Sequence, residues 1–361
     1  MSCFLGYACT TTAPIRSMPK PPAALCTLSS LERAFADGLA TMLAQQHGLG
    51  AYILVLANAA YDAALWARLA APLALRHAEL AALVTRTLRR GGRLEEPDDD
   101  ALVFLKLLAI GFENLQTMQS RRAGPWALAF NPIRALRPPR MSGAKIDARS
   151  RPFDPAGFHF NHPFLAREIL WEGELAGKAA RLLYNKFPFA RLHGLLLPEP
   201  ARELPQSLTP ELHGWAWEVR AGTAVPGFCL AYNSQGAQAS VNHLHFQSFV
   251  QTEPLPLLNP SFSHNGGADA YPLPCHRFGD VEEAWFHIDG LHALAIPYNL
   301  VYTSDGLYVL ARAQQGSRAM ASWNCGFAWS ELAGAITVFS RDEFDRLSET
   351  EIAAELASHA P

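Results

Sequence analysis

Two histidines and a glutamine stand at alternate positions within residues 242–247. If this stretch is a strand, successive side chains point to opposite faces, so His243, His245 and Gln247 share one face. A neutral imidazole is available as a nucleophile at physiological pH because its unperturbed pKa is about 6.5. It can attack phosphorus and hold the transferred group covalently, which splits one displacement into two. In the preceding loop, Gly236 has no Cβ and lets the backbone approach an anion closely.

The same spacing also suits a metal pair, because imidazole nitrogens are common ligands of zinc and copper. A complete metal site would need further sulfur, imidazole or carboxylate ligands. The chain has six cysteines, none of them in a C-x-x-C pair: Cys3, Cys9, Cys26, Cys229, Cys275 and Cys325. From the motif alone, a metal pair, a polar strand edge and a nucleophile all stay open.

The pattern H-x-H-x-Q resembles the signature of the histidine-triad superfamily of nucleotidyl hydrolases and transferases. The longer run AYNSQGAQASVNHLHFQ, residues 231–247, is similar to the GDP-hexose phosphorylases, which act on GDP-L-galactose in plants and GDP-D-glucose in animals. The segment NKFPFARLH, residues 185–193, agrees with this resemblance, as do residues 270–275, 296–300 and 329–334. The similar part covers roughly residues 125 to 361, and the first hundred or so residues contribute nothing to it.

The resemblance implies roles for the residues of the motif. His245 would be the nucleophile that forms a nucleotidyl-histidine intermediate, and Gln247 would hold the non-bridging phosphoryl oxygens. His243 and His193 would orient and polarise the surroundings of the nucleophile. Fixed amide and hydroxyl donors stabilise the charge that builds up on phosphoryl oxygens in the transition state, without having to reorganise.

Further residues are implied to hold the nucleotide. Asn233 and Ser240 would contact phosphate oxygens, and Asn185 would contact the ribose hydroxyls. The proline-, glycine- and arginine-rich residues 130–163 form a long irregular connection, which is either a solvated linker or functional. We favour a phosphate- or base-contacting role for it, carried by Arg134 and Lys145.

One departure from the wider superfamily concerns metal. The galactose-1-phosphate uridylyltransferases share H-x-H-x-Q and also carry a C-x-x-C metal pair, whereas residues 151–154 of this chain, at the candidate position, contain no sulfur. We therefore expect no bound metal and no cofactor, with His243 making a hydrogen bond instead of a metal bond.

The expected reaction is conversion of a GDP-hexose and phosphate into hexose 1-phosphate and GDP through nucleotidyl-His245. The residues do not distinguish phosphate from a sugar phosphate or water as the second acceptor. A dinucleoside polyphosphate phosphorylase, cleaving diadenosine tetraphosphate through the same intermediate, is the alternative enzyme. A non-catalytic nucleotide-binding sensor is the alternative of another class, and it would show tight binding without turnover.

Composition limits the classes of protein that this chain can represent. Hydrophobic residues make up 49% and charged residues 17% of its 361 residues, typical of a soluble globular protein. The net charge of −3 provides no basic field for nucleic acid. The start is not a convincing signal peptide, no apolar run reaches transmembrane length, and the scattered cysteines are typical of reduced thiols. We expect a cytoplasmic protein that binds no membrane.

The chain divides into three parts. Residues 1–28 are irregular, and residues 29–124 form a helical domain or cap in which Ser29 and Glu32 make a capping box. The acidic loop over residues 95–100 caps a further helix, which is predicted over residues 101–122. We expect this region to serve packing or homodimerisation and not to act as a substrate lid. Residues 125–361 form the nucleotidyltransferase or phosphorylase domain.

From about residue 165 the hydrophobic period changes to two, which predicts α+β architecture with a histidine-triad-like antiparallel sheet. Thr209 caps a helix that runs to about Arg220, and Ser348 with Glu351 caps the last helix. The turn Ser304-Asp305-Gly306 joins a hairpin. This hairpin belongs to a degenerate second half, because no second H-x-H occurs. The predicted strands are residues 180–184, 191–197, 228–232, 240–250, 298–303, 307–312 and 335–340.

Overall fold

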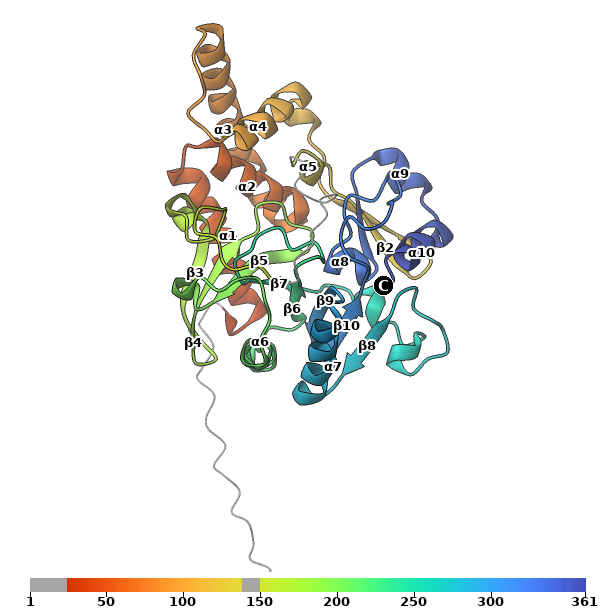
Figure 1. Ribbon diagram of the computed structural model, residues 1–361. Helices are drawn as coiled ribbons and strands as arrows, with labels where there is room; N and C mark the ends of the chain where they lie inside the picture. Colours follow the sequence, from red (N-terminus) through yellow and green to blue (C-terminus); the bar gives the residue numbers. More distant parts are fainter. Residues whose placement is uncertain (1–24, 138–149) are drawn as a thin grey trace, which may run out of the picture.

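The computed structural model describes residues 25–137 and 150–361 (Figure 1). Most of the expected irregular N-terminus and Lys145 lie outside the described residues. The fold is α+β, with a helical N-terminal region beside a large antiparallel sheet, as the sequence predicts. Among the described residues, none of the helices combines the length and the hydropathy that a membrane-spanning segment needs.

Four helices form the N-terminal region, and their first cap differs from the prediction. Thr27, not Ser29, caps the first helix, because its hydroxyl accepts the Ser30 N–H at 3.0 Å and Ser30 bonds back. Glu32 is thereby left free to pair with Arg191 of the sheet domain. The helices are α1 (Leu28–Gln45), α2 (Leu49–Tyr61), α3 (Ala63–Arg89) and α4 (Asp98–Ile110).

The helix predicted to run through residue 122 is wrong after Ile110. Gly111 adopts a positive φ of 79° and ends α4, because an L side chain rarely takes that conformation. The chain then forms the hairpin of β1 (Gln119–Ala123) and β2 (Trp126–Phe130). Strand β2 also pairs in parallel with β11 (Ala335–Val338). The resulting three-stranded sheet, β1-β2-β11, brings together segments about two hundred residues apart in the chain.

The main sheet has eight strands in the order β3-β4-β5-β7-β6-β9-β10-β8, and all neighbours are antiparallel. The predicted strand pair, the following two strands and the Asp-Gly hairpin are all present, while β3 and β8 were not predicted as separate strands. The strands are β3 (Ile169–Leu175), β4 (Lys178–Tyr184), β5 (Arg191–Pro198), β6 (Phe228–Asn233), β7 (Phe246–Val250), β8 (Cys275–Phe278), β9 (Tyr298–Thr303) and β10 (Gly306–Ala311).

Strand β7 is shorter than the predicted strand over residues 240–250. The backbone before Phe246 bonds to a loop instead of to a neighbouring strand. The Leu244 N–H donates to the Leu204 carbonyl at 2.7 Å, and the His245 N–H donates to the Gln206 side chain at 2.9 Å. His243 and His245 therefore precede the strand, and the prediction that they share one strand face with Gln247 is wrong.

The main sheet contains two halves of one topology. The segment β5-α6-β6-β7 places its strands in the order β5-β7-β6, and the segment β8-α7-β9-β10 places them in the order β8-β10-β9. The two halves join where β6 pairs with β9. Helix α6 (Pro210–Gly222) begins at the predicted cap Thr209, and α7 (Val281–Leu294) is its counterpart. The second half carries no H-x-H-x-Q, as expected from the sequence.

Alternating strand residues divide the core between the two faces of the sheet. Tyr298, Leu300 and Tyr302 of β9 pack in one cluster with α1, α2, α6 and α7, whereas Val301 packs in a second cluster on the other face. That second cluster contains the C-terminal helices α8 (Trp329–Leu332), α9 (Arg341–Arg346) and α10 (Glu349–Ser358), the last with the predicted capping box.

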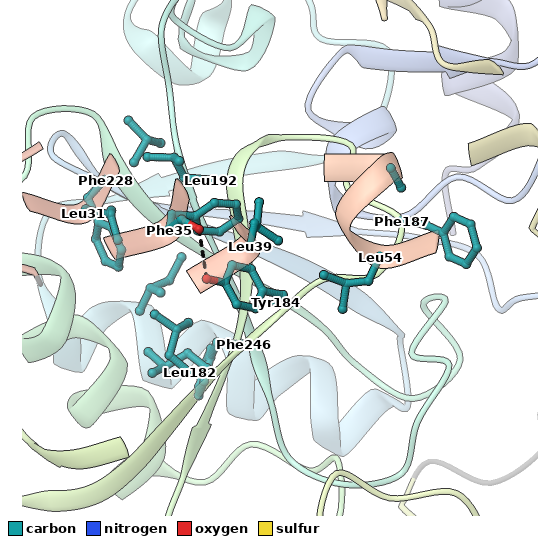
Figure 2. Packing of buried hydrophobic residues seen from close by; sticks show 14 of the residues in the cluster. Leu31, Phe35, Leu39, Leu54, Leu182, Tyr184, Phe187, Leu192, Phe228 and Phe246 are labelled. Carbon is teal, nitrogen blue, oxygen red and sulfur yellow. Dashed lines mark hydrogen bonds between the residues drawn. The ribbon is translucent and has the colours of Figure 1, made fainter. Parts of the chain in front are cut away.

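The helical region shares its core with the sheet. Figure 2 shows Phe35 and Leu39 of α1 packed around Tyr184 of β4, whose hydroxyl donates to the Phe35 carbonyl at 3.0 Å. The Phe35 and Tyr184 rings meet edge to face with centroids 4.7 Å apart. Burial of these aromatic and aliphatic side chains fixes α1 and α2 against the sheet, so the position of the helical region is set by apolar packing.

Candidate active site

A cavity of about 830 Å³ opens on the sheet face to which Gln247 points, within the usual size range of small-molecule sites. His245 and Gln247 lie on its wall, while His243, His193 and Gly236 do not. Gly236 has a φ of 78°, and a Cβ there would come 3.1 Å from Pro297, so this glycine serves a turn outside the cavity. Four other predicted residues also line the cavity: Arg134, Asn185, Asn233 and Ser240.

The His245 ring is held with one nitrogen bonded and the other available. Its Nδ1 lies 2.8 Å from the His243 carbonyl oxygen, which can only accept, so Nδ1 carries the proton and Nε2 keeps its lone pair. Burial lowers the pKa of His245 to about 4, although the bond to the His243 carbonyl opposes this shift. The ring is therefore neutral at pH 7, as a nucleophile must be.

Gln206 fixes the backbone on which His245 is mounted. Its Oε1 accepts the His245 N–H at 2.9 Å, and its Nε2 donates to the carbonyls of His245 at 3.2 Å and Asn233 at 3.0 Å. The residue is 1% exposed. It therefore joins the two segments that carry the predicted nucleophile, His245, and the predicted phosphate contact, Asn233. No sequence pattern marked Gln206, because its bonds join positions far apart in the chain.

His243 lies next to His245 but does not line the cavity. Its Nδ1 accepts the Phe160 N–H at 3.1 Å, and its ring packs against the rings of Phe153 and Phe160. Burial, followed by the nearby His245, lowers the pKa of His243 to about 4. The direct influence of His243 on His245 passes through its backbone carbonyl, which selects the tautomer.

Gln247 presents its amide group in one orientation. Its Oε1 accepts from the indole Nε1–H of Trp329 at 2.8 Å and lies 3.0 Å from His193 Nε2. The Phe189 N–H donates to His193 Nδ1 at 3.3 Å, so His193 Nε2 carries a proton and is the second donor. Burial, and then Arg134, lower the pKa of His193 to about 3 and keep it neutral. The NH₂ group of Gln247 is left for the cavity.

Asn233 is oriented in the same way. Its Oδ1 accepts from Asn299 Nδ2 at 2.6 Å and from the backbone N–H of Trp329 at 3.3 Å. Its NH₂ group has no partner among the described residues and lies on the cavity wall. Trp329 thus orients two amides, one through its backbone and one through its side chain. The resulting pair of N–H donors beside His245 suits an anion.

Arg134 adds a partly buried cation to the same wall. Its guanidinium donates to the Phe187 carbonyl and lies 4.3 Å above the centre of the Phe189 ring. Burial lowers its pKa, while Glu331 acts in the opposite direction. Asn185 turns its Oδ1 toward the Phe187 N–H at 3.1 Å, and its amide nitrogen lies 3.3 Å from His193 Nε2. The residues around Phe187 therefore connect the cation with the predicted ribose contact.

The helical region contributes to the cavity, beyond the packing or dimerisation role expected from the sequence. Residues 97–100, at the start of α4, lie on the wall together with Lys106 and Lys186. Lys186 Nζ lies 2.5 Å from Asp100 Oδ1, so an ion pair joins this wall to the sheet domain. Within residues 25–137 and 150–361, no three His, Cys, Asp or Glu side chains are placed to hold a metal ion.

Comparison with known proteins places the sequence match in the part of the chain that carries the motif. Residues 127–249, which begin in β2 and end in β7, match the family model described as the GDPGP1-like N-terminal domain. The resemblance to GDP-hexose phosphorylases is confirmed. The matched segment contains the H-x-H-x-Q motif, Gln206 and all of the predicted phosphate contacts, whereas α1 to α4 lie before it.

The curated relatives include GDP-D-glucose phosphorylase 1 of Homo sapiens, 37% identical over 164 residues, which are 43% of this chain and 42% of the human protein. GDP-D-glucose phosphorylase 1 of Xenopus laevis is 40% identical over 210 residues, covering 50% of this chain and 52% of that protein. GDP-L-galactose phosphorylase 1 of Arabidopsis thaliana is 41% identical over 135 residues, which cover 33% of this chain and 30% of that protein. The chain thus spans about two fifths of the length of the human relative.

A solved structure with a similar arrangement is that of yeast Ap4A phosphorylase Apa2. It aligns with a TM-score of 0.49 at 17% sequence identity, over 74% of this chain and 95% of the yeast chain.

Proposed function

We propose that this protein is a nucleotide-sugar phosphorylase that converts a GDP-hexose and inorganic phosphate into hexose 1-phosphate and GDP. The observation that carries the proposal is the state of His245, a neutral imidazole with Nδ1 bonded to the His243 carbonyl and Nε2 available at the cavity wall. The named relatives act on GDP-D-glucose and GDP-L-galactose, which gives the substrate class.

The first step is attack of His245 Nε2 on the α-phosphorus of the GDP-hexose. A bond forms between Nε2 and phosphorus, and the bond from the α-phosphorus to the bridging oxygen breaks. That oxygen leaves with the β-phosphate as hexose 1-phosphate. Because Nδ1–H already donates to the His243 carbonyl, the positive charge that develops on the ring meets a fixed acceptor.

The second step is attack of a phosphate oxygen on the same phosphorus. The bond to Nε2 breaks, GDP forms and the imidazole returns to its neutral state. In both steps negative charge increases on the non-bridging oxygens, where the NH₂ groups of Gln247 and Asn233 are oriented to donate. Ser240 and Arg134 on the same wall supply a hydroxyl and a cation for the remaining phosphate oxygens. Asn185 is the proposed ribose contact.

The test is a phosphorolysis panel on the purified full chain. Phosphate is supplied with GDP-glucose, GDP-mannose, GDP-galactose, UDP-glucose or diadenosine tetraphosphate, and the nucleotide products are separated. Release of GDP from one GDP-hexose is the expected result and names the sugar. Formation of ADP and ATP from the dinucleotide would assign the chain to the alternative phosphorylase reaction instead. Nucleotide binding without any product would favour the sensor.

Two histidine variants, one in the cavity and one outside it, test whether the phosphorolysis activity depends on His245. His245→Ala is expected to abolish product formation while the thermal unfolding transition stays in place. His264→Ala serves as the control, because His264 is a partly buried, hydrogen-bonded histidine that does not line the cavity. Product formation by His245→Ala at the wild-type rate would exclude the covalent scheme.

A cytoplasmic location and a homodimer belong to the same proposal. Cys229, Cys275 and Cys325 are free thiols, which suits a reducing compartment. Exposed leucines gather on the helical region, Leu75 and Leu83 on α3 and Leu102 on α4. Sedimentation of the full chain measures the oligomeric state directly.

A further inference from the structure

The cavity continues away from His245 along a row of phenylalanine rings. The Phe160 ring centre lies 5.0 Å from that of His245, Phe158 lies 6.0 Å from Phe160, and Phe164 lies 6.4 Å from Phe158. Phe158 and Phe164 are 44% and 50% exposed, although both line the cavity. Flat aromatic faces exposed within a binding cavity favour stacking with a planar ring such as a nucleobase.

Glu168 lies on the same wall with its carboxylate unpaired. It ends η3 (Pro163–Glu168), the short helix that also carries Phe164, and the residue is 7% exposed. Among residues 25–137 and 150–361, no group forms a hydrogen bond or an ion pair with its carboxylate. Buried polar groups are nearly always hydrogen-bonded, so a buried carboxylate that faces a cavity without a partner indicates a ligand with donors.

One of the two neighbouring cations, Lys186, is paired elsewhere. Lys186 Nζ pairs with Asp100 Oδ1 at 2.5 Å. The nitrogens of Lys186 and Arg167, together with an oxygen of Asp100, all lie within 4 Å of the position that a Cβ on Gly50 would take. These groups form a compact charged cluster at the contact between α2, α4 and the sheet domain. Lys186 and Arg167 act on Glu168 electrostatically but donate no hydrogen bond to it. Both carboxylate oxygens of Glu168 are therefore available to a ligand.

We propose that Glu168 reads the Watson–Crick edge of guanine, with its two oxygens accepting from N1–H and the N2 amino group while the base lies against Phe158 and Phe164. This assignment rests on the proposed function, since it places the base of the GDP-hexose. An ionised carboxylate only accepts, and guanine alone among the common bases offers two adjacent donors on that edge. Adenine and cytosine each offer one amino group beside an acceptor nitrogen there, and uracil offers one N–H between two carbonyls.

The protonation of Glu168 supports the assignment. Burial raises the pKa of its carboxyl to about 7, with a smaller raising effect from Asp100 and opposing effects from Lys186 and Arg167. Two guanine donors stabilise the ionised form, so binding of the base lowers this pKa and releases a proton near neutral pH. Guanosine, which has no phosphate to titrate, is the suitable probe for that release.

The main experiment compares GMP with IMP, which lacks only the N2 amino group. Calorimetric affinities are measured for the wild type, Glu168→Gln and the matched control Glu174→Gln, whose carboxylate is exposed on β3 away from the cavity. The wild type and the control are expected to bind GMP about tenfold or more tightly than IMP. In Glu168→Gln that ratio is expected to fall to within about threefold. An unchanged GMP-to-IMP ratio in this variant would overturn the proposal.

A wild-type measurement keeps the proposal testable if Glu168→Gln does not fold. Guanosine is titrated into the protein at pH 7 in buffers of different ionisation enthalpy, which reports the protons exchanged. Net proton release is expected with guanosine and not with uridine, and no release with guanosine would contradict the assignment. These binding readouts do not depend on turnover. Failure of the phosphorolysis panel with an intact GMP preference would therefore reject the reaction and leave the base site standing.

Discussion

The indole Nε1–H of Trp329 lies 2.8 Å from Oε1 of Gln247. An indole nitrogen only donates, so this contact determines which end of the Gln247 amide is the oxygen and turns the NH₂ group toward the cavity. The backbone N–H of the same tryptophan acts in the same way on Asn233 at 3.3 Å. One buried residue near the C-terminal end of the chain thus orients two side-chain amides carried by strands of the first half.

Removing the indole donor is expected to slow the chemistry more than it weakens binding. In Trp329→Phe the Gln247 amide loses one of the two donors that hold its oxygen, so its NH₂ group is no longer fixed on the transition-state oxygens. We expect kcat to fall by roughly tenfold to a hundredfold while KM changes by less than about threefold. Steady-state phosphorolysis of the best GDP-hexose measures both quantities.

The control is Trp215→Phe, which also removes a buried indole hydrogen bond. Trp215 donates to the Leu175 carbonyl at 2.8 Å and does not line the cavity. It is expected to lower thermal stability and leave kcat near that of the wild type. Equal losses of kcat in the two variants would show that Trp329 contributes only to folding.

Gln206 is expected to matter for both stability and rate. Gln206→Leu removes three hydrogen bonds and leaves the backbone groups of His245 and Asn233 buried without partners. Each unsatisfied group costs about 1 to 3 kcal/mol, so the free energy of unfolding should fall by several kcal/mol. Gln251→Leu is the control, because Gln251 bonds only weakly, to the Cys229 sulfur. Equal stabilities of the two variants would contradict the role assigned to Gln206.

The pH dependence of the first chemical step should reflect a strongly shifted imidazole. His245 stays neutral until the pH approaches its folded-state pKa of about 4. The rate constant of nucleotidyl transfer at saturating GDP-hexose should therefore stay level from pH 8 down to about 5.5, where an ordinary histidine would already be protonated. Rapid-quench measurements without phosphate report this step. A loss of rate with a midpoint at about 6.5 would show that the ring is not desolvated as described.

The free energy of unfolding should fall as the pH is lowered, because several buried histidines have lowered pKa values in the folded state. Burial lowers the pKa of His193 to about 3 and that of His243, His245 and His359 to about 4. The unfolded chain binds these protons at about 6.5, so stability is complete above that pH and is lost as the pH falls toward the folded-state values. Each such imidazole contributes on the order of 1.4 kcal/mol per pH unit across this window. Denaturant midpoints measured at pH 7.5, 6 and 5 test the sign, and a midpoint that rises with acid would contradict it.

Local signals predicted much of the fold. Period-two strands, the Thr209 cap and the Ser304-Asp305-Gly306 hairpin are specified by neighbouring residues and were found where expected. The strand over residues 240–245 was wrong because its backbone partners, Leu204 and Gln206, lie in a distant loop that no local pattern reveals. The helix beyond Ile110 was wrong because a single Gly111 ends it.

Part of the site could be predicted from the sequence, and its arrangement less so. The motif predicts a nucleophilic imidazole, which stays a prediction, while His245 and Gln247 do lie on one cavity wall. The contributions proposed for Trp329 and Gln206 depend on hydrogen bonds between residues far apart in the chain, and the one proposed for Glu168 depends on its burial beside the cavity. Each residue taken alone resembles ordinary core or surface. The helical region carries no motif that indicates a binding site. The beginning of α4 nevertheless lines the cavity, where Asp100 pairs with Lys186 of the sheet domain.

The central claim is the covalent intermediate on His245, and trapping it tests that claim most directly. The protein is mixed with GDP-hexose in the absence of phosphate, quenched under alkaline conditions that preserve phosphoramidates, and examined by intact-protein and peptide mass spectrometry. We predict one added GMP on the peptide that contains His245, its disappearance with GDP formation when phosphate is added, and no adduct in His245→Ala. Steady turnover without any adduct on that peptide, or an adduct that persists in His245→Ala, would contradict the account.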